Sequence, residues 1–433
     1  MHPLEYLFGL EFHGHKLGLD NIRAITAALG RPQDAYPSVV VAGTNGKGSV
    51  CAMVSAALTA AGYRTGCYTS PHLVRIEERF AIDGVPAPQA ELEAVVEHLR
   101  AVVERLSRDG RLQATPTFFE VATAAAFELF RRRGVSAAVL EVGMGGRLDA
   151  TAAAAPLAGA ITNIALDHQQ YLGHTLEEIA YEKAGIARPG MRLVCGERAP
   201  GPRRVIAVSC AERGAQFVDA SEGVTLSSAA GGGAISMTLR TPAGTYGPVR
   251  LGLRGRHQVQ NALVAVRLME AFSDAGAAVP ARAIEHGLRE AKWPGRLDWR
   301  RLPDGRGVLL DAAHNVAGAA ALADYLRDAV PGGRQPLVFG AVRDKDHAGM
   351  LRHLLPCASR LVITVPPTPR AAEPGALRAA ALAIDPGLGV AIEPDPAAAV
   401  DAAWALAPDI TVAGSIFLLG AVLPVVESRG GAW

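Results

Sequence analysis

The stretch Ser38–Gly62, SVVVAGTNGKGSVCAMVSAALTAAG, decides how this chain folds. It begins with three β-branched residues, Val39–Val41, which are typical of a buried parallel strand. A glycine-rich turn follows, and an alanine-rich segment with good helix propensity then runs to Gly62. Strand, glycine turn and helix together are the setting in which backbone N–H groups and a helix N-terminus can hold a phosphate.

The glycine-rich turn is the run Gly43-Thr44-Asn45-Gly46-Lys47-Gly48-Ser49. It fits the common phosphate-loop pattern G-x-x-x-x-G-K-[ST] imperfectly, because Val41 takes the place of the first glycine and Gly48 separates the lysine from Ser49. A plain glycine turn between a strand and a helix is the simpler interpretation. A lysine between two glycines at the head of a helix nevertheless favours nucleotide binding, with Lys47 reaching the outer phosphates.

Length and composition restrict the class of protein. A chain of 433 residues is too long for one ordinary core, so two or three domains are expected. A formal net charge of +1 and an aromatic content of 5% give no electrostatic or stacking argument for nucleic-acid binding. The five cysteines are scattered without a CxxC pair, which favours free thiols in a reducing compartment. No signal peptide or membrane-spanning run is recognised, so we expect a cytoplasmic protein without a membrane partner.

Strands and helices alternate along the chain in two series. The pattern predicts an α/β protein of two domains: an N-terminal nucleotide-binding parallel sheet with helices on both faces, and a smaller C-terminal Rossmann-like domain. Trp293-Pro294-Gly295-Arg296 interrupts the periodicity between the two series. We therefore expect domains at residues 1–292 and 300–433, joined by a hinge at 293–299.

Polar residues follow several predicted strands, and in open α/β sheets ligands bind at the carboxyl ends of strands. They are Glu141, Asp167 and His168 in the first half, and Asp311, His314, Asn315, Asp344, Lys345 and Asp346 in the second. Each one alone is more simply a capping acid or a loop histidine with a local partner. Together with a phosphate loop they indicate a site at the top of each sheet. A carboxylate and an imidazole such as Glu141 and His168 suit Mg²⁺, which keeps phosphate oxygens and waters as further ligands.

Nine ordered motifs resemble the folylpolyglutamate synthase/dihydrofolate synthase family of the Mur-ligase superfamily, whose members are ATP-dependent amide-forming ligases. They are VAGTNGKGSV (41–50), YTSPHLVRIEERF (68–80), PTFFE (116–120), LEVGMGGRLDAT (140–151), ALDHQQYLGHTLEEIAYEKAGI (165–186), RHQVQNA (256–262), WPGR (293–296), LLDAAHN (309–315) and RDKD (343–346). The superfamily's own loop has the form GTNGKG[ST], which accounts for the poor fit to the general pattern.

The resemblance implies roles for individual residues. The nucleotide contacts are Gly43, Thr44, Asn45, Gly46, Lys47, Gly48, Ser49, Asn261, Arg296 and Asp311. The magnesium ligands are Ser70, Glu141 and His168. Two metal ions are expected to spread the charge on the phosphoryl group that ATP transfers. Lys183 resembles a lysine that the family carboxylates, although the sequence alone would leave it an ordinary helix lysine. The other catalytic residues are Lys47, His314, Lys345 and Asp346, the last two setting the incoming L-glutamate.

The resemblance also implies a mechanism and a substrate pocket. A substrate carboxylate attacks the γ-phosphorus of ATP to give an acyl phosphate, and the amino group of glutamate then displaces phosphate, with the domains closed against water. The pterin pocket is lined by Thr117, Phe118, Phe119, Glu120, Leu148, Asp149 and Ala150. The helical spacing of Phe118 and Phe119 would equally suit core packing.

The choice of acceptor stays open in the sequence. Bifunctional bacterial members carry an Ile-Asp pair before the Leu-Gly-Leu of the N-terminal lead-in, where this chain has His15-Lys16. A lysine cannot accept hydrogen bonds from the pterin edge, which weakens the assignment of dihydropteroate as a substrate. We expect a bifunctional, monomeric enzyme. The alternatives are polyglutamylation alone, another Mur-type amino-acid ligase, or a non-catalytic nucleotide-dependent regulatory module.

Overall fold

The computed structural model describes residues 2–13 and 18–431, and the predicted pocket residue Lys16 lies outside them. The chain divides into two compact units. The first comprises residues 1–227, 238–249 and 260–291, and the second comprises residues 228–237, 250–259 and 292–433. The predicted domain and hinge boundaries near residue 293 stay predictions, since the units are defined by compactness alone.

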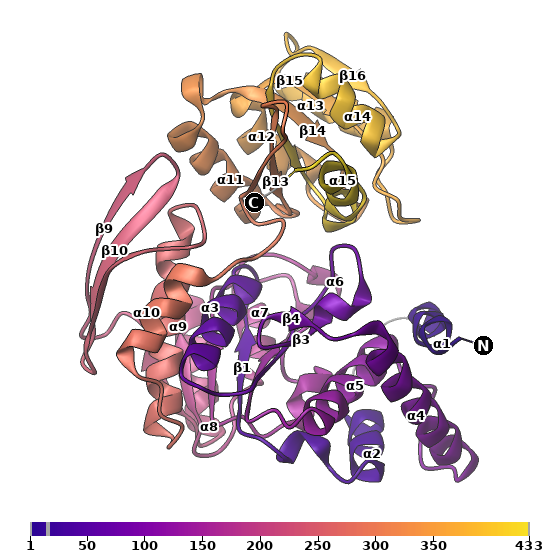
Figure 1. The fold of residues 1–433 in the computed structure, drawn as a ribbon, viewed down its shortest axis with the longest axis vertical. Helices are drawn as coiled ribbons and strands as arrows, with labels where there is room; N and C mark the ends of the chain where they lie inside the picture. The colour runs from indigo at the N-terminus through magenta and orange to yellow at the C-terminus, as the bar shows by residue number, and fades with distance from the viewer. Residues whose placement is uncertain (1, 14–17, 432–433) are drawn as a thin grey trace. The chain divides into compact units, whose positions relative to one another are not determined.

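The first unit is built on an eight-stranded sheet with the order β4-β3-β2-β5-β1-β6-β7-β8. Figure 1 labels β1, β3 and β4 of this sheet. Its strands are β1 (Ser38–Ala42), β2 (Thr65–Tyr68), β3 (Phe80–Ile82), β4 (Val85–Pro86), β5 (Ala137–Glu141), β6 (Ala158–Ile161), β7 (Arg192–Cys195) and β8 (Gln216–Asp219). All neighbouring pairs are parallel except β2–β3 and β3–β4, which run antiparallel. The expected parallel sheet is therefore confirmed, with a short antiparallel edge that the sequence analysis had treated as loop.

Ten helices of the described residues accompany this sheet. They are α1 (Pro3–Gly9), α2 (Asp20–Ala28), α3 (Lys47–Ala60), α4 (Gln89–Arg108), α5 (Phe118–Arg132), α6 (Gln169–Leu172), α7 (Leu176–Ala184), α8 (Pro200–Glu212), α9 (His257–Asp274) and α10 (Ala281–Glu290). Short 3₁₀ turns η3 (Ile76–Arg79) and η4 (Ala150–Ala153) follow β2 and β5. The helix α3 matches the alanine-rich segment that the sequence predicts to be helical up to Gly62.

Residues on one face of the central strands contribute to two hydrophobic cores. Val40 of β1 and Leu140 of β5 are register partners, so their side chains lie on the same face of the sheet. Leu140 belongs to a core that includes residues of α4 and α5, and Val40 to one that includes residues of α7 and α8. The β-branched run at 39–41 is fully buried as a central strand, as its composition predicted.

A separate three-stranded sheet has the order β11-β10-β9. Its strands are β9 (Thr225–Gly231), β10 (Ala234–Arg240) and β11 (Thr245–Arg250). The Ser-, Thr- and Gly-rich composition of this segment, with its short alternating runs, predicts antiparallel strands at the edge of the domain. All seven residues of β9 are exposed, which explains why its sequence lacks the apolar alternation of a buried strand.

The second unit contains a six-stranded sheet with the order β12-β13-β17-β14-β15-β16. Its strands are β12 (Asp298–Arg301), β13 (Gly307–Asp311), β14 (Gln335–Phe339), β15 (Ala358–Ile363), β16 (Val390–Ile392) and β17 (Asp409–Ala413). Its helices are α11 (Val316–Ala329), α12 (His347–Leu354), α13 (Pro374–Ile384), α14 (Pro396–Trp404) and α15 (Ile416–Ser428). Only β12 runs antiparallel to its neighbour, so the predicted second α/β series is confirmed.

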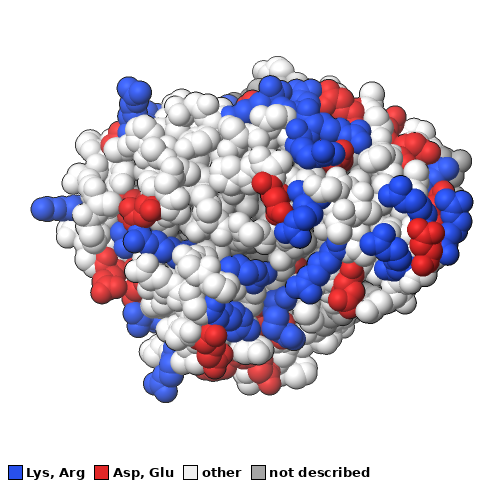
Figure 2. All heavy atoms as spheres, turned by 90° about the horizontal axis from the view of Figure 1, so that it is seen from below, with Lys and Arg blue, Asp and Glu red and all other residues white. Residues whose placement is uncertain are grey.

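The surface is of mixed charge. Figure 2 shows Lys and Arg side chains interspersed with Asp and Glu side chains on the face that it presents. None of the helices in residues 2–13 and 18–431 combines the length and the apolar character that crossing a membrane requires.

Candidate active site

The glycine-rich loop between β1 and α3 needs glycine at two positions. Gly43 has φ 143° and Gly46 has φ 82°, both in the region that side chains rarely adopt. A Cβ atom on Gly43 would lie 1.9 Å from Thr162 Oγ1, and one on Gly46 would lie 2.3 Å from Asn261 Oδ1. The backbone of this loop is therefore packed directly against the end of β6 and against α9.

The loop is held from outside by residues that follow β6. The Thr44 amide donates to the Asn163 carbonyl at 2.9 Å, and the Asn45 amide donates to Asn163 Oδ1 at 3.0 Å. Thr162 Oγ1 donates to the Asn45 carbonyl at 2.6 Å. Sequence analysis did not single out Thr162 and Asn163. The only signal available was that two polar residues follow a predicted strand.

Lys47 is the first residue of α3 and folds back across the loop. Its Nζ donates to the Gly43 carbonyl at 3.1 Å and to the Thr44 carbonyl at 3.3 Å. No carboxylate of the described residues lies within ion-pair distance of this ammonium group. A cation resting on neutral carbonyls beside a helix N-terminus is suited to exchange those contacts for phosphate oxygens.

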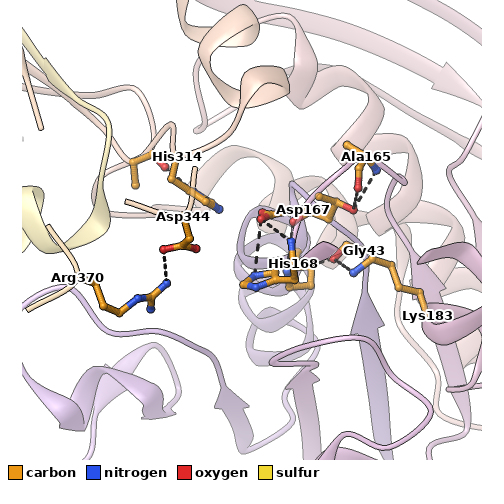
Figure 3. Close-up of polar contacts among 11 residues, drawn as sticks. Gly43, Ala165, Asp167, His168, Lys183, His314, Asp344 and Arg370 are labelled. Atoms are coloured by element: carbon orange, nitrogen blue, oxygen red, sulfur yellow. Dashed lines mark hydrogen bonds and ion pairs between the residues drawn. The ribbon is translucent and has the colours of Figure 1, made fainter. Parts of the chain in front are cut away.

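Lys183 of α7 lies far from this loop in the sequence and contacts it in the folded chain. Its side chain is buried, and its Nζ donates to the Gly43 carbonyl at 2.9 Å (Figure 3). Burial and the nearby Lys47 charge lower the pKa of Lys183 to about 7, while Asp167 and Asp149 act weakly in the opposite direction. A buried lysine that loses its charge near neutral pH can act as a nucleophile, which an ordinary helix-surface lysine cannot.

Glu141 and Ser70 are brought together beside the loop. Glu141 is the last residue of β5, is buried, and is the register partner of Val41 at the end of β1. The Ser70 amide, which follows β2, donates to Glu141 Oε2 at 3.1 Å. The predicted pair of oxygen ligands therefore lies at the carboxyl ends of three adjacent strands, where ligands of open α/β sheets bind.

His168 caps the short helix α6 in a left-handed conformation with φ 51°. Its amide donates to Asp167 Oδ1 at 2.9 Å, and its Nε2 lies 4.0 Å from the same oxygen (Figure 3). The imidazole is 42% exposed whereas the Asp167 carboxylate is almost buried. The His168 imidazole is thus accessible to a ligand, and the Asp167 carboxylate lies near it.

The donor set fits a hard divalent cation better than a zinc-type site. Glu141 and Ser70 supply oxygen donors, and Mg²⁺ is commonly held by one or two protein oxygens together with phosphates and waters. Within residues 2–13 and 18–431, no group of three His, Cys, Asp or Glu residues converges as a metal site. A metal bound here would therefore depend on the nucleotide for much of its coordination.

The segment predicted to line the pterin pocket begins with a helix cap. Thr117 Oγ1 accepts from the Glu120 amide, and Glu120 Oε2 accepts from the Thr117 amide at 2.8 Å, which forms a reciprocal capping box on α5. Both side chains are buried. These contacts give Thr117 and Glu120 a structural task, and their contact with substrate stays a prediction.

The two phenylalanines of the same segment differ in their surroundings. Phe118 stacks on Phe8 of α1, with ring centroids 6.0 Å apart. Phe119 lies 6.0 Å from the Tyr68 ring and packs on Gly143, where a Cβ atom would come within 2.5 Å of the Phe119 ring. Phe118 is therefore associated with the N-terminal helix and Phe119 with the glycine turn after β5.

Asp149 organises the turn that contains the other predicted pocket residues. Its Oδ2 accepts from the amides of Gly143 and Met144, both at 3.0 Å, and its Oδ1 accepts from the amide and hydroxyl of Thr151. Burial raises the pKa of Asp149, and these hydrogen bonds oppose the shift. Leu148 is half-buried and Ala150 is buried beside it, so the turn is rigid.

Asn261 of α9 lies against Gly46, as a nucleotide contact in this loop would require. In the second unit, Asp311 ends β13, and its Oδ2 accepts from the Leu297 amide at 2.8 Å. Burial raises the pKa of Asp311, and the Arg296 charge opposes the shift. The structure thus brings Arg296 and Asp311 together, as the sequence predicted for a shared site.

The remaining predicted residues of the second unit follow β13 and β14. His314 shares a hydrogen bond of 2.9 Å between Nδ1 and the Ala312 carbonyl, so Nδ1 carries the proton. Asp346 caps α12, with Oδ1 accepting from the Gly349 amide at 2.8 Å. Lys345 precedes this cap, and the neighbouring Asp344 accepts from Arg370 at 2.9 Å (Figure 3).

Comparison with known proteins places these features in a family. The Mur ligase middle domain matches residues 41–269, and the Mur ligase glutamate ligase domain matches residues 295–418. A dihydrofolate synthase/folylpolyglutamate synthase of Bacillus subtilis is 35% identical over 344 residues, which cover 79% of each chain.

Two solved structures are similar over nearly the whole chain. The Mycobacterium tuberculosis folylpolyglutamate synthase complexed with ADP and AMPPCP has a TM-score of 0.90 and 34% identity, covering 98% of both chains. A bifunctional folylpolyglutamate synthase/dihydrofolate synthase with Mn, AMPPNP and L-glutamate bound has a TM-score of 0.85 and 30% identity, covering 99% of this chain and 98% of that one.

Proposed function

Because this chain belongs to the dihydrofolate synthase/folylpolyglutamate synthase family of the Mur ligases, which are ATP-dependent ligases, we propose that its active site adds L-glutamate to both dihydropteroate and folates. The observation that carries this proposal is the loop at residues 43–49. There Lys47 rests on two backbone carbonyls beside a buried carboxylate, Glu141, that can hold a metal.

The reaction has two steps. A carboxylate oxygen of the acceptor attacks the γ-phosphorus of ATP, the bond to the β-bridging oxygen breaks, and ADP leaves an acyl phosphate. The amino group of L-glutamate then attacks the acyl carbon, loses a proton, and expels inorganic phosphate as the amide forms. Lys47 leaves the Gly43 and Thr44 carbonyls to hold the outer phosphates, where its charge offsets the charge on the transferring group.

Ser70, Glu141 and His168 are the residues proposed to hold Mg²⁺, which would neutralise phosphate charge and orient the γ-phosphoryl group. Asn261, Arg296 and Asp311 are proposed as further nucleotide contacts. His314 is proposed to act near the nucleotide, and Lys345 and Asp346 are proposed to set the incoming glutamate. Asn261 is supported by its contact with the loop glycine, Asp311 by its place at the end of β13, and Arg296 by the action of its charge on Asp311. His314, Lys345 and Asp346 lie in the segments that follow β13 and β14.

Lys183 is proposed to carry a carboxylate on Nζ. The ammonium group first loses one proton to give the neutral amine, which attacks CO₂; a C–N bond forms and a second proton leaves to solvent, so that a cation becomes an anion beside Lys47. The support is that the amine is buried and shares the Gly43 carbonyl with Lys47. Crystals grown near neutral pH with bicarbonate should show density for the added carboxylate, and an unmodified Lys183 in well-resolved density would contradict the proposal.

The test of the whole assignment is a glutamate- and ATP-dependent assay with separate acceptors. We expect product from dihydropteroate and from a reduced folate. Product from the reduced folate alone would restrict the enzyme to polyglutamylation and would direct attention to Lys16, whose reversion to Asp should then restore dihydropteroate turnover. Product only with muramyl peptides would overturn the assignment in favour of another Mur-type ligase.

We further propose that the enzyme acts as a monomer in the cytoplasm. The five cysteines are all buried and free, as in a reducing compartment. Light scattering on the purified protein measures the mass of the particle, and fractionation of the producing cells locates the protein.

A further inference from the structure

Arg79 is a buried cation that the sequence analysis did not single out. It ends η3 and is only 8% exposed. Its Nε donates to His72 Nδ1 at 2.8 Å, and its guanidinium carbon lies 4.9 Å above the centre of the Phe118 ring. No carboxylate of the described residues pairs with it, although Glu11, Glu78 and Glu141 exert an electrostatic pull from a distance.

The second buried arginine of the described residues shows how such a charge is normally compensated. Arg300 is 4% exposed, and its Nε and Nη2 donate to the two carboxylate oxygens of Asp298 at 2.8 and 3.1 Å. A buried charge without a partner is strongly unfavourable, so a protein retains one where a ligand supplies the opposite charge. Arg79 has the burial of Arg300 without its carboxylate.

The free end of Arg79 faces open space. Some polar atoms of the described residues are fully enclosed without a partner, Tyr6 Oη and Asn21 Oδ1 among them. Neither terminal nitrogen of Arg79 is enclosed in this way, and neither has a protein partner among the described residues. Both are therefore available to a carboxylate, which the planar guanidinium can bind through two parallel hydrogen bonds.

The surroundings of Arg79 define the ligand. On one side lies the Phe118 ring, which together with Phe8 offers an aromatic surface. The charge of Glu141, a proposed metal ligand, also acts on the guanidinium. A ligand that uses both the aromatic surface and the guanidinium has a flat ring system and an anionic group.

We propose that Arg79 binds the acceptor carboxylate that becomes phosphorylated, and that His72 and Phe118 hold the guanidinium in place for it. This inference rests on the proposed function and identifies the group that recognises the reacting end of the substrate. During the first step a carboxylate oxygen forms the bond to phosphorus and ADP leaves, while Arg79 stays protonated throughout. It is a substrate-binding residue, and His72 is a positioning residue.

The test measures binding without turnover. Wild-type protein and the variants Arg79→Lys and Arg79→Gln are titrated with dihydropteroate and with its neutral carboxamide, in the absence of ATP and metal, by calorimetry. We expect the wild type to prefer the carboxylate by about 10- to 100-fold, as a charge-assisted bidentate contact would give. Arg79→Lys should keep part of this preference, whereas Arg79→Gln should bind both compounds alike.

Other outcomes are equally informative. If Arg79 only packs on Phe118, Arg79→Gln will weaken both compounds by the same factor and the preference will survive, which overturns the inference. If the wild-type protein itself shows no preference, the inference fails without any variant, even if Arg79→Gln does not fold. If the wild type binds a muramyl peptide and neither pterin, the proposed function fails, and this inference fails with it.

Discussion

Charged residues of the candidate site have different kinds of partner in the two units. In the first unit, the cations Lys47, Lys183 and Arg79 contact backbone carbonyls or an imidazole and no carboxylate of the described residues. In the second unit, two carboxylates have local partners: Asp344 pairs with Arg370, and Asp346 caps α12. A cation without a carboxylate partner is suited to bind an anionic ligand, whereas a carboxylate with a local partner supports the local structure. The first unit is therefore where we expect substitution to affect chemistry without affecting stability.

Lys47→Ala is expected to have the largest effect on the reaction rate and only a small effect on stability. We expect the rate to fall by about a thousandfold or more, because the lysine serves phosphate charge. The free energy of unfolding should change by no more than about 0.5 kcal/mol, because Lys47 makes only two hydrogen bonds to its own loop. Steady-state kinetics at saturating ATP and urea denaturation measure the two quantities.

The exposed Lys292 provides the matched control for Lys47, since Lys292→Ala removes a lysine of the same charge from the surface. Turnover by Lys292→Ala should stay at the wild-type value. Wild-type turnover by Lys47→Ala would refute the assignment of the phosphate loop.

Carboxylation of Lys183 should depend on pH in a way that no surface lysine does. Since burial and Lys47 lower the pKa of Lys183 to about 7, the neutral amine that reacts with CO₂ accumulates as the pH rises through 7. With ¹³C-labelled bicarbonate, the carbamate signal of the folded protein should increase between about pH 6 and pH 8 and vanish in Lys183→Ala. A carbamate signal that rises only near pH 10 would show that Lys183 has the pKa of an ordinary lysine. The positive charge of Lys183 would then be compensated within the first unit.

Asp149 tests whether the contrast follows the unit or the individual residue. It accepts four hydrogen bonds from the turn after β5, so Asp149→Ala should destabilise the protein by about 2–4 kcal/mol. Glu141→Gln keeps an acceptor for the Ser70 amide, so its free energy of unfolding should fall by less than about 1 kcal/mol. The same substitution should abolish metal-dependent turnover. Thermal or urea unfolding compares the two variants, and equal losses of stability would break the distinction.

Asp346 gives the smallest expected effect. Asp346→Ala removes the cap of α12 and should cost about 1 kcal/mol, whereas Asp346→Asn should keep the cap. If Asp346 acts only as a cap, Asp346→Asn will retain full turnover. A large rise in the KM for L-glutamate in Asp346→Asn, with stability unchanged, would instead place the carboxylate in the glutamate step.

The fold could be predicted where local pattern and burial agree. The valine run before the loop and the amphipathic segments that became α4 and α5 correspond closely to the observed elements. The two-residue strand β4 and the antiparallel strand β12 were missed, because strands so short or so placed carry no periodic signal.

The site could be predicted only in part, for a different reason. Ser70 and Glu141 were brought together from motifs far apart in the chain. Asp149 is a predicted pocket residue that also holds the turn after β5, and Arg79 is buried without a carboxylate partner among the described residues. Both properties depend on which atoms face each other after folding. An acid in a turn and an arginine after two glutamates look alike in sequence whether they serve structure or chemistry.

The short strand β4 has a consequence for the solution behaviour of the protein. It forms one edge of the eight-stranded sheet and consists of Val85 and Pro86 alone. Proline has no amide hydrogen, so this edge offers a further strand at most one donor, and two residues are too few to template a ladder. Val85 is 66% exposed, and a longer strand in its place would present an apolar, hydrogen-bonding rim to other copies of the chain. The truncated edge thus protects a large sheet against edge-to-edge aggregation.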